Sequence, residues 1–298
     1  AGEFYTPRTI VKLMIWLLDP QPGDSVYDPA CGTGGMLIEA IKYIHNDKQT
    51  YGKIYGQEKN LSTSAIASMN LLLHGKTDVT VTQGDTLRHP NYIEGGKLKT
   101  FNCVVANPPF SLKNWGASQF ETDMYGRNMW GCPTDKNGDF AWLQHMVKSM
   151  YPVRGKCAVV LPQGVLFKGN REGAIREELI KTDLLDCVIG LTSGVFYSTT
   201  VSACILFLNN RKPKEHKGRV CMIDASSIYT AQRAQNVMSE DDIERVYKLY
   251  ADYKDVIDYV KIVTNEEIIA NGNSLAINSY IEKQGEEVIP PEEVRKKL

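Results

Sequence analysis

The sequence has 298 residues, enough for one large domain or for one such domain with a smaller extension. Its formal net charge of −1 excludes a protein that holds nucleic acid by an overall basic excess. No apolar run approaches the roughly 20 residues of a membrane span, so no membrane association is expected. Seven cysteines without a CxxC pair are typical of reduced thiols in a cytoplasmic protein, and because no metal-ligand spacing is present, no metal is expected.

Strand and helix patterns alternate along most of the chain, which predicts an α/β fold with a parallel sheet. The expected helices are 9–18, 36–45, 62–73, 140–150 and 172–180. The expected strands are 25–27, 53–57, 79–83, 101–106, 157–161, 185–189 and 201–208. The last two strands follow one another directly and are expected to form an antiparallel hairpin at the sheet edge. Strand 219–223 and helix 240–250 are expected as an appendix to this sheet.

A glycine-rich loop follows the first expected strand. Residues 28–35 are Asp-Pro-Ala-Cys-Gly-Thr-Gly-Gly and lead into a helix. Glycines let the backbone pass close to a ligand, and a helix N-terminus presents unpaired N–H groups. The spacing is not G-x-G-x-x-G and no Lys follows, so pyrophosphate is not the expected ligand. The opening Asp28 suits a ligand that carries an amine and a sulfonium, and an ordinary connecting turn is the alternative.

Two further acidic residues end the next two strands. Glu58 has two oxygens that can accept from both hydroxyls of a ribose. Asp85 is placed to accept from an adenine amino group. Either residue alone would be a solvated strand end. Acidic residues at three successive strand ends, however, indicate one nucleoside-like ligand.

The fourth strand is followed by Asn107-Pro108-Pro109-Phe110. Open α/β sheets bind ligands at the carboxyl ends of their strands. The Asn107 side-chain oxygen and the Pro108 carbonyl are two acceptors that could grip an exocyclic amino group and localise its lone pair. The prolines stiffen the segment and remove two donors, and Phe110 offers a face on which a base could stack. A plain strand-terminating turn is the alternative.

Residues 111–138 form a stretch too long for an ordinary connection. The stretch carries Trp115, Phe120, Tyr125 and Trp130 among charged residues. Aromatic residues beside a catalytic strand suggest a loop that closes on an extruded base. An irregular excursion that packs its own aromatic side chains is the equal alternative.

These motifs resemble a known family. Residues 28–35 and 107–110 resemble the cofactor and catalytic motifs of amino-group DNA methyltransferases that use S-adenosylmethionine, and segment 2–8 lies upstream as in the group that methylates adenine N6. The chain is most similar to the modification subunit of type I restriction-modification systems. Further stretches carry that resemblance, namely 55–58, 69–75, 160–167, 189–191 and 223–226. The resemblance covers roughly residues 2–260.

The resemblance implies a Rossmann-like, S-adenosylmethionine-dependent methyltransferase fold. Its sheet is expected to be mostly parallel and seven-stranded, with an antiparallel edge hairpin. Residues 1–230 would be the catalytic domain, and residues 231–298 a C-terminal helical extension with a polar tail. The N-terminal helical domain of the family is expected to be absent, so the chain is interpreted as a catalytic-domain fragment that binds cofactor and methylates DNA poorly alone.

The same resemblance assigns the site residues. The catalytic set would be Asn107, Pro108, Pro109 and Phe110. The cofactor would be bound by Glu3, Phe4, Tyr5, Thr6, Pro7, Arg8, Asp28, Ala30, Gly32, Thr33, Gly34, Gly35, Glu58 and Asp85. An aromatic pair beside a sulfonium is physically reasonable, because ring faces attract cations. A hydrophobic staple for helix 9–18 is the alternative for Phe4 and Tyr5.

The implied activity is methylation of adenine N6 in DNA after the target base is flipped out. The implied partners are a specificity subunit that reads the DNA, a second modification subunit, and a translocating restriction subunit. Related motifs also serve cytosine N4, RNA guanine and protein glutamine, so these substrates remain alternatives. A cofactor-sensing scaffold without independent activity is a further alternative.

Overall fold

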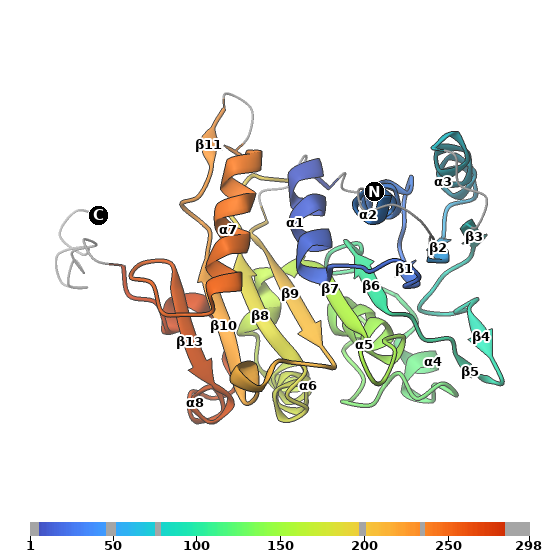
Figure 1. Ribbon diagram of the computed structural model, residues 1–298. Coiled ribbons are helices and arrows are strands. Elements are labelled where there is room, and N and C mark those ends of the chain that lie inside the picture. The colour runs from blue at the N-terminus through green and yellow to red at the C-terminus, as the bar shows by residue number, and fades with distance from the viewer. Residues whose placement is uncertain (1–5, 46–51, 75–78, 197–200, 233–235, 284–298) are drawn as a thin grey trace, which may run out of the picture.

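The computed structural model describes residues 6–45, 52–74, 79–196, 201–232 and 236–283. Within these ranges a central sheet lies between two layers of helices (Figure 1). One layer contains α1 (Arg8–Leu18), α2 (Gly35–His45), α3 (Leu61–Leu73) and α7 (Glu240–Asp252). The other contains α4 (Ala117–Glu121), α5 (Asp139–Lys148), α6 (Asn170–Lys181) and α8 (Asn265–Ala270). None of these helices in the described part of the chain is long and apolar enough to cross a bilayer.

Nine strands of the described chain form the main sheet, in the order β13-β10-β8-β9-β7-β6-β1-β2-β3. Their bounds are β1 Val26–Asp28, β2 Ile54–Glu58, β3 Val79–Gln83, β6 Cys103–Ala106, β7 Lys156–Pro162, β8 Leu185–Gly190, β9 Ala203–Asn209, β10 Arg219–Asp224 and β13 Val260–Thr264. Two short hairpins stand apart, β4 (Ile93–Glu94) with β5 (Lys97–Leu98) and β11 (Thr230–Ala231) with β12 (Asn236–Val237).

Strand order reverses between β1 and β6. The chain runs outward from β1 through β2 to β3, then returns to β6 on the other side of β1 and continues to β7. These five strands are parallel, with Val26 paired with Ile54 on one side and with Cys103 on the other. Such a reversal leaves a crevice at the carboxyl ends of the two strands. The first half of the sheet therefore places its crevice beside Asp28 and Asn107.

The predicted α/β class is confirmed, and the sheet is larger than predicted. Seven strands were expected, with β8 and β9 as the edge hairpin. In the structure β9 is antiparallel to both β7 and β8 and lies between them. Strand β10 then adds in parallel to β8, and β13 adds antiparallel to β10 as the outermost strand. Each added strand pairs backbone groups that the predicted edge would have left open.

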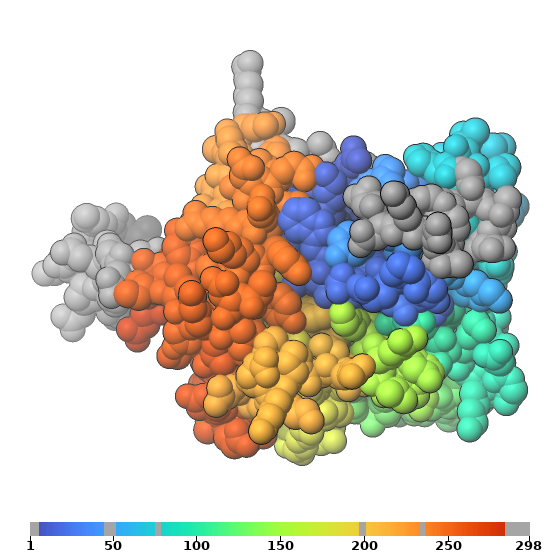
Figure 2. Space-filling model, viewed as in Figure 1, coloured from blue at the N-terminus to red at the C-terminus, as the bar shows by residue number. Residues whose placement is uncertain are grey.

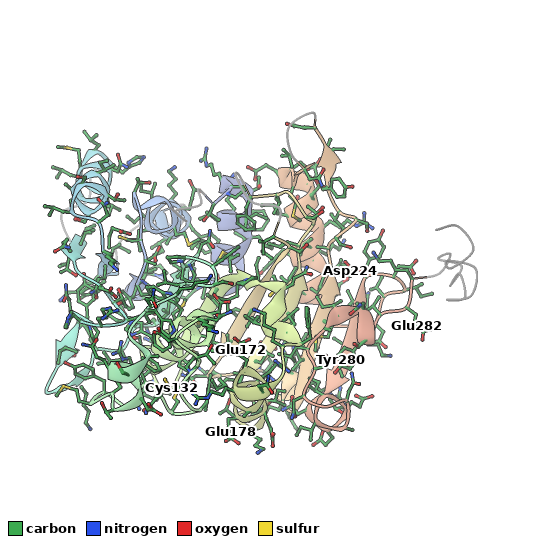
Figure 3. The ribbon with its side chains drawn as sticks, turned by 180° about the vertical axis from the view of Figure 1, so that it is seen from behind. Cys132, Glu172, Glu178, Asp224, Tyr280 and Glu282 are labelled. Carbon is green, nitrogen blue, oxygen red and sulfur yellow. The ribbon has the colours of Figure 1, made fainter. Side chains whose placement is uncertain are left out.

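The C-terminal elements pack onto the same sheet. Helix α7 lies beside α1 (Figure 2). Between these two helices, the rings of Trp16 and Tyr247 meet edge to face with centroids 5.8 Å apart. Beyond α8, the chain returns to the end of β10, where Lys283 Nζ lies 3.1 Å from the Asp224 carboxylate. Viewed from behind, Asp224, Tyr280 and Glu282 lie on the side of the molecule that carries β10 and β13 (Figure 3). The predicted extension thus contributes a strand to the main sheet and a contact with the end of β10, as well as helices.

Strand β6 is an apolar run because both of its faces are covered. Cys103 and Val105 face the cluster that includes α1 and α2, whereas Val104 and Ala106 face the cluster that includes α5 and α6. Because successive side chains point to opposite faces, a strand covered on both faces has no polar alternation. The first polar side chain after β6 is therefore that of Asn107, at the carboxyl end of the strand.

The excursion 111–138 packs its own aromatic side chains. Phe120 is fully buried and Trp115 is 2% exposed, and the two rings meet edge to face. They share a small cluster with Leu87 and with Trp142 of α5. The structure therefore favours the second interpretation of this segment over a loop that closes on a base.

Candidate functional site

Asp28, Glu58, Asp85 and Asn107 lie at the carboxyl ends of neighbouring strands. Parallel strands β6, β1, β2 and β3 are neighbours in that order, so their carboxyl ends lie side by side. Asp28 and Glu58 are the last residues of β1 and β2. Asn107 directly follows β6, and Asp85 follows β3 after the single residue Gly84.

Asp28 begins a tight loop between β1 and α2. Its side chain is 2% exposed, and Oδ1 accepts a hydrogen bond from the Ala30 N–H at 3.0 Å. Gly32 and Gly34 have φ of 52° and 86°, a region that favours glycine. Burial raises the pKa of Asp28 from 3.8 to about 8; the Ala30 N–H opposes this rise and the nearby Glu58 charge adds to it. This raised pKa favours the protonated form of the Asp28 carboxyl at neutral pH.

Glu58 ties this loop to the second strand. One carboxylate oxygen accepts the Gly32 N–H at 3.0 Å, and the other accepts the Asn60 N–H at 2.8 Å. Each oxygen keeps a further lone pair for a hydroxyl donor. The side chain that was predicted to bind a ribose is thus held in place by the backbone on both sides.

Asp85 is ion-paired, which sequence reasoning did not anticipate. Lys59 Nζ lies 2.9 Å from Oδ2, and Arg88 Nε lies 3.7 Å from the same oxygen. The Asp85 side chain nevertheless lines the same cavity as Glu58. It remains an available acceptor on the lone pairs that these cations leave open.

Two cavities of about 560 and 510 Å³ open at the carboxyl ends of these strands. Ala30, Gly32 and Asn107 line both cavities, so Asn107 stands where they adjoin. The larger cavity runs between the ends of β2 and β3 and reaches Trp142. The other runs along the start of α2 and includes Asp28, Thr33 and Gly35.

Residues 107–110 are held by two long-range contacts. Asn107 Nδ2 donates to Thr6 Oγ1 at 2.8 Å, and Asn107 Oδ1 is buried without a partner among the described residues. Phe110 meets Phe196 edge to face at 6.0 Å. Just beyond it, the Ser111 N–H donates to Asp139 Oδ1 at 2.7 Å, with Ser111 at a φ of 50°.

The N-terminal segment is described only in part. Glu3, Phe4 and Tyr5 lie outside the described residues, so their predicted roles stay predictions. Thr6 and Arg8 line the 510 Å³ cavity. Pro7 precedes the first turn of α1, and the Arg8 Nε lies 3.1 Å from the Glu39 carboxylate.

Several wall residues were not singled out from the sequence. Lys59, Asn60, Leu112 and Trp142 line the larger cavity. Trp142 belongs to α5, more than thirty residues after Asn107, and its apolar surroundings suggested only a core helix. Lys59 and Asn60 directly follow Glu58, so their adjacency was the one signal that could have identified them.

The donors and acceptors fit a nucleoside with a cationic substituent. The larger cavity offers Glu58 toward vicinal hydroxyls and Asp85 toward an amino group. The adjoining cavity offers the buried carboxyl of Asp28, whose ionised form a cation would stabilise. Among the described residues, no group of three or more His, Cys, Asp or Glu side chains is arranged to hold a metal ion.

Comparisons with known proteins agree with this geometry. The N-6 DNA Methylase family matches residues 1–288. The type I restriction enzyme MjaVII methylase subunit of Methanocaldococcus jannaschii is 33% identical over 294 residues, covering 94% of this chain and 49% of that protein. The HindI methylase subunit of Haemophilus influenzae is 34% identical over 292 residues, covering 94% and 64%. The crystal structure of a type I methyltransferase subunit from Streptococcus thermophilus aligns with a TM-score of 0.86 at 32% identity, covering 95% and 60%.

A sheet that reverses between β1 and β6 and inserts an antiparallel β9 has the fold of S-adenosylmethionine-dependent methyltransferases. Within that class, the chain belongs to the N-6 DNA methylase family. The chain spans about half the length of the curated Methanocaldococcus relatives that it matches.

Proposed function

We propose that this chain transfers a methyl group from S-adenosylmethionine to N6 of adenine in DNA, within the modification subunit of a type I restriction-modification complex. The observation that carries the proposal is the position of Asn107. Its amide borders both cavities and has a buried oxygen without a partner among the described residues, in a family of N-6 DNA methylases.

The cofactor would occupy both cavities. Glu58 would accept from the ribose hydroxyls, and Asp85 would accept from the adenine amino group. Asp28 would face the cationic end, beside the backbone of Gly32 and Thr33. The cofactor supplies an electrophilic methyl group on a sulfonium. Because Asn107 lies where the two cavities adjoin, the reacting carbon would lie next to its amide.

The target base would be held on the other side of Asn107. The Asn107 oxygen and the Pro108 carbonyl would accept hydrogen bonds from the two N6–H groups, which localises the nitrogen lone pair toward the methyl carbon. Phe110 would contact the base, which is flipped out at a cost of a few kcal/mol. No strong general base is required, because the N6 proton becomes acidic only after methylation. Positioning would supply much of the rate gain.

The partners follow from charge and from the relatives. A chain with 34 basic and 35 acidic residues has no general attraction for DNA phosphates. The relatives are named as subunits of type I restriction enzymes. We therefore assign target reading to a separate specificity subunit, with a second modification subunit and a restriction subunit completing a cytoplasmic complex.

Nucleoside mass analysis tests this proposal. DNA treated with the full-length subunit in its complex is expected to gain N6-methyladenine, and Asn107→Ala is expected to abolish this gain while cofactor affinity stays nearly intact. Glu58→Ala is expected to have the reverse effect, with cofactor binding weakened more than the transfer step. The appearance of N4-methylcytosine alone, or methylated RNA or protein instead of DNA, would support one of the other amino-group substrates. Cofactor binding without any transfer would support a sensing scaffold.

A further inference from the structure

The hydrogen bond between Thr6 and Asn107 joins the start of the chain to the catalytic segment. Asn107 Nδ2 donates to Thr6 Oγ1 at 2.8 Å, across 101 residues of sequence. The same amide leaves Oδ1 buried and without a partner among the described residues. Of the two ends of this amide, the donor end is therefore committed and the acceptor end is available.

The orientation of this amide decides whether it can hold an amino group. A side-chain amide carries two donors at one end and an acceptor at the other, with nearly equal shapes. Rotation by 180° about the last side-chain bond exchanges them at little steric cost. In the exchanged state, the Asn107 NH₂ would face the N–H groups of the target amine, and no hydrogen bond could form.

A rigid element supports Thr6. Pro7 follows it with φ of −53°, and α1 begins at the next residue. Ile10 and Leu13 of α1 are fully buried in the core, so the helix start has little freedom. The hydroxyl that accepts from Asn107 is consequently held by the packing of α1 against the sheet.

We propose that Thr6 is a positioning residue. Its hydroxyl fixes the Asn107 amide so that the amide oxygen faces the target amine. This role rests on the proposed function and adds to it. The resemblance assigned Thr6 to the cofactor alone, and Thr6 does line the 510 Å³ cavity. The two roles make different predictions, because a cofactor ligand changes affinity, whereas an amide-orienting group changes the rate of transfer at saturation.

Thr6→Val and Thr6→Ser form a matched pair for the test. Valine keeps the shape of threonine and removes the acceptor, whereas serine keeps the hydroxyl and removes a methyl group. In the full-length subunit within its complex, Thr6→Val is expected to slow single-turnover methylation by about 10- to 100-fold at saturating cofactor and DNA. Thr6→Ser is expected to stay within about threefold of the unmodified enzyme, and the dissociation constant for S-adenosylmethionine to change little in either variant.

A comparison of rate, affinity and stability separates positioning from general damage. If Thr6 acts through Asn107, then Thr6→Val is expected to lower the saturated rate while cofactor affinity and thermal unfolding stay close to those of the unmodified complex. Normal saturated rates with weakened cofactor binding in Thr6→Val would overturn the inference and leave Thr6 as a cofactor ligand. A Thr6→Ser enzyme as slow as Thr6→Val would also overturn it. An unmodified complex that binds cofactor and methylates nothing would refute the proposed function itself, and this inference with it.

Discussion

Three acidic residues that look equivalent in the sequence have three different environments. Asp28 is buried with its pKa raised to about 8, Glu58 accepts two backbone N–H groups, and Asp85 pairs with Lys59. Strand ends are readable from apolar runs, so the positions of these residues were predictable. Their environments depend on contacts between segments that are distant in sequence or turn sharply, which no local pattern encodes.

The buried carboxyl of Asp28 should make cofactor binding depend on pH. A cationic ligand favours the ionised carboxylate, so below pH 8 binding must release the proton that Asp28 holds. The affinity of the unmodified protein for the cofactor, divided by that of Asp28→Asn at the same pH, is therefore expected to rise from pH 6 toward pH 8. Because the ligand titrates equally in both measurements, its own titration cancels in this ratio. Calorimetry in buffers of different ionisation enthalpy measures the released proton, and a constant ratio across this range would contradict the assignment.

The same residue should affect the stability of the unliganded protein. The folded state has the raised pKa and the unfolded state the ordinary one, so between pH 4 and pH 8 the folded state binds more protons. This residue's contribution therefore falls as pH rises through that window. Thermal unfolding measures this effect. Between pH 6 and pH 8, the stability of Asp28→Asn is expected to fall less than that of the unmodified chain. A parallel decline in both proteins would show that Asp28 is already ionised.

At the scale of elements, periodicity predicted most helices and strands but not every pairing. The four-residue apolar strand before Asn107 and the helix around Ile10 and Leu13 are clear from sequence, because burial on one or two faces leaves a regular pattern. Strand β13 was missed: it is short, and Lys261 interrupts its apolar residues. The Thr6 contact with Asn107 had no sequence signal, since it depends on how α1 packs.

The excursion 111–138 is fixed to the cavity wall by Arg127, which also forms a buried ion pair within the excursion. Arg127 and Asp123 are 3% and 4% exposed and lie 2.6 Å apart. The Arg127 guanidinium also donates to the carbonyls of Thr86 and Leu87. Thr86 in turn donates to the Pro29 carbonyl at 2.6 Å. The excursion therefore supports the segment that carries Asp85.

Removing one partner of this buried pair is expected to be costly. Arg127→Met leaves the Asp123 carboxylate buried and uncompensated, which destabilises proteins by about 3–5 kcal/mol. Urea unfolding measures the loss. Lys181→Met provides the control, because that exposed ion pair should contribute little. The double variant Arg127→Met with Asp123→Leu is expected to be more stable than Arg127→Met alone, and equal effects of the Arg127 and Lys181 changes would refute the supporting role.

At the scale of the whole molecule, the nearly neutral net charge is the basis for proposing that a separate subunit recognises the DNA. We expect the 298-residue chain alone to bind S-adenosylmethionine and to bind duplex DNA weakly. Fluorescence anisotropy over a salt series measures the DNA affinity, and addition of a specificity subunit is expected to raise both affinity and methylation. Robust, sequence-specific methylation by this chain alone would contradict that division.

The most direct test of the account is a crystal structure of the protein with sinefungin, an unreactive analogue of the cofactor. The adenosine part is expected in the 560 Å³ cavity between Glu58 and Asp85, with the amino acid part along the 510 Å³ cavity past Asp28. The amine that replaces the sulfonium methyl should then point to Asn107. An analogue bound away from the carboxyl ends of β1, β2 and β6 would contradict the central claim.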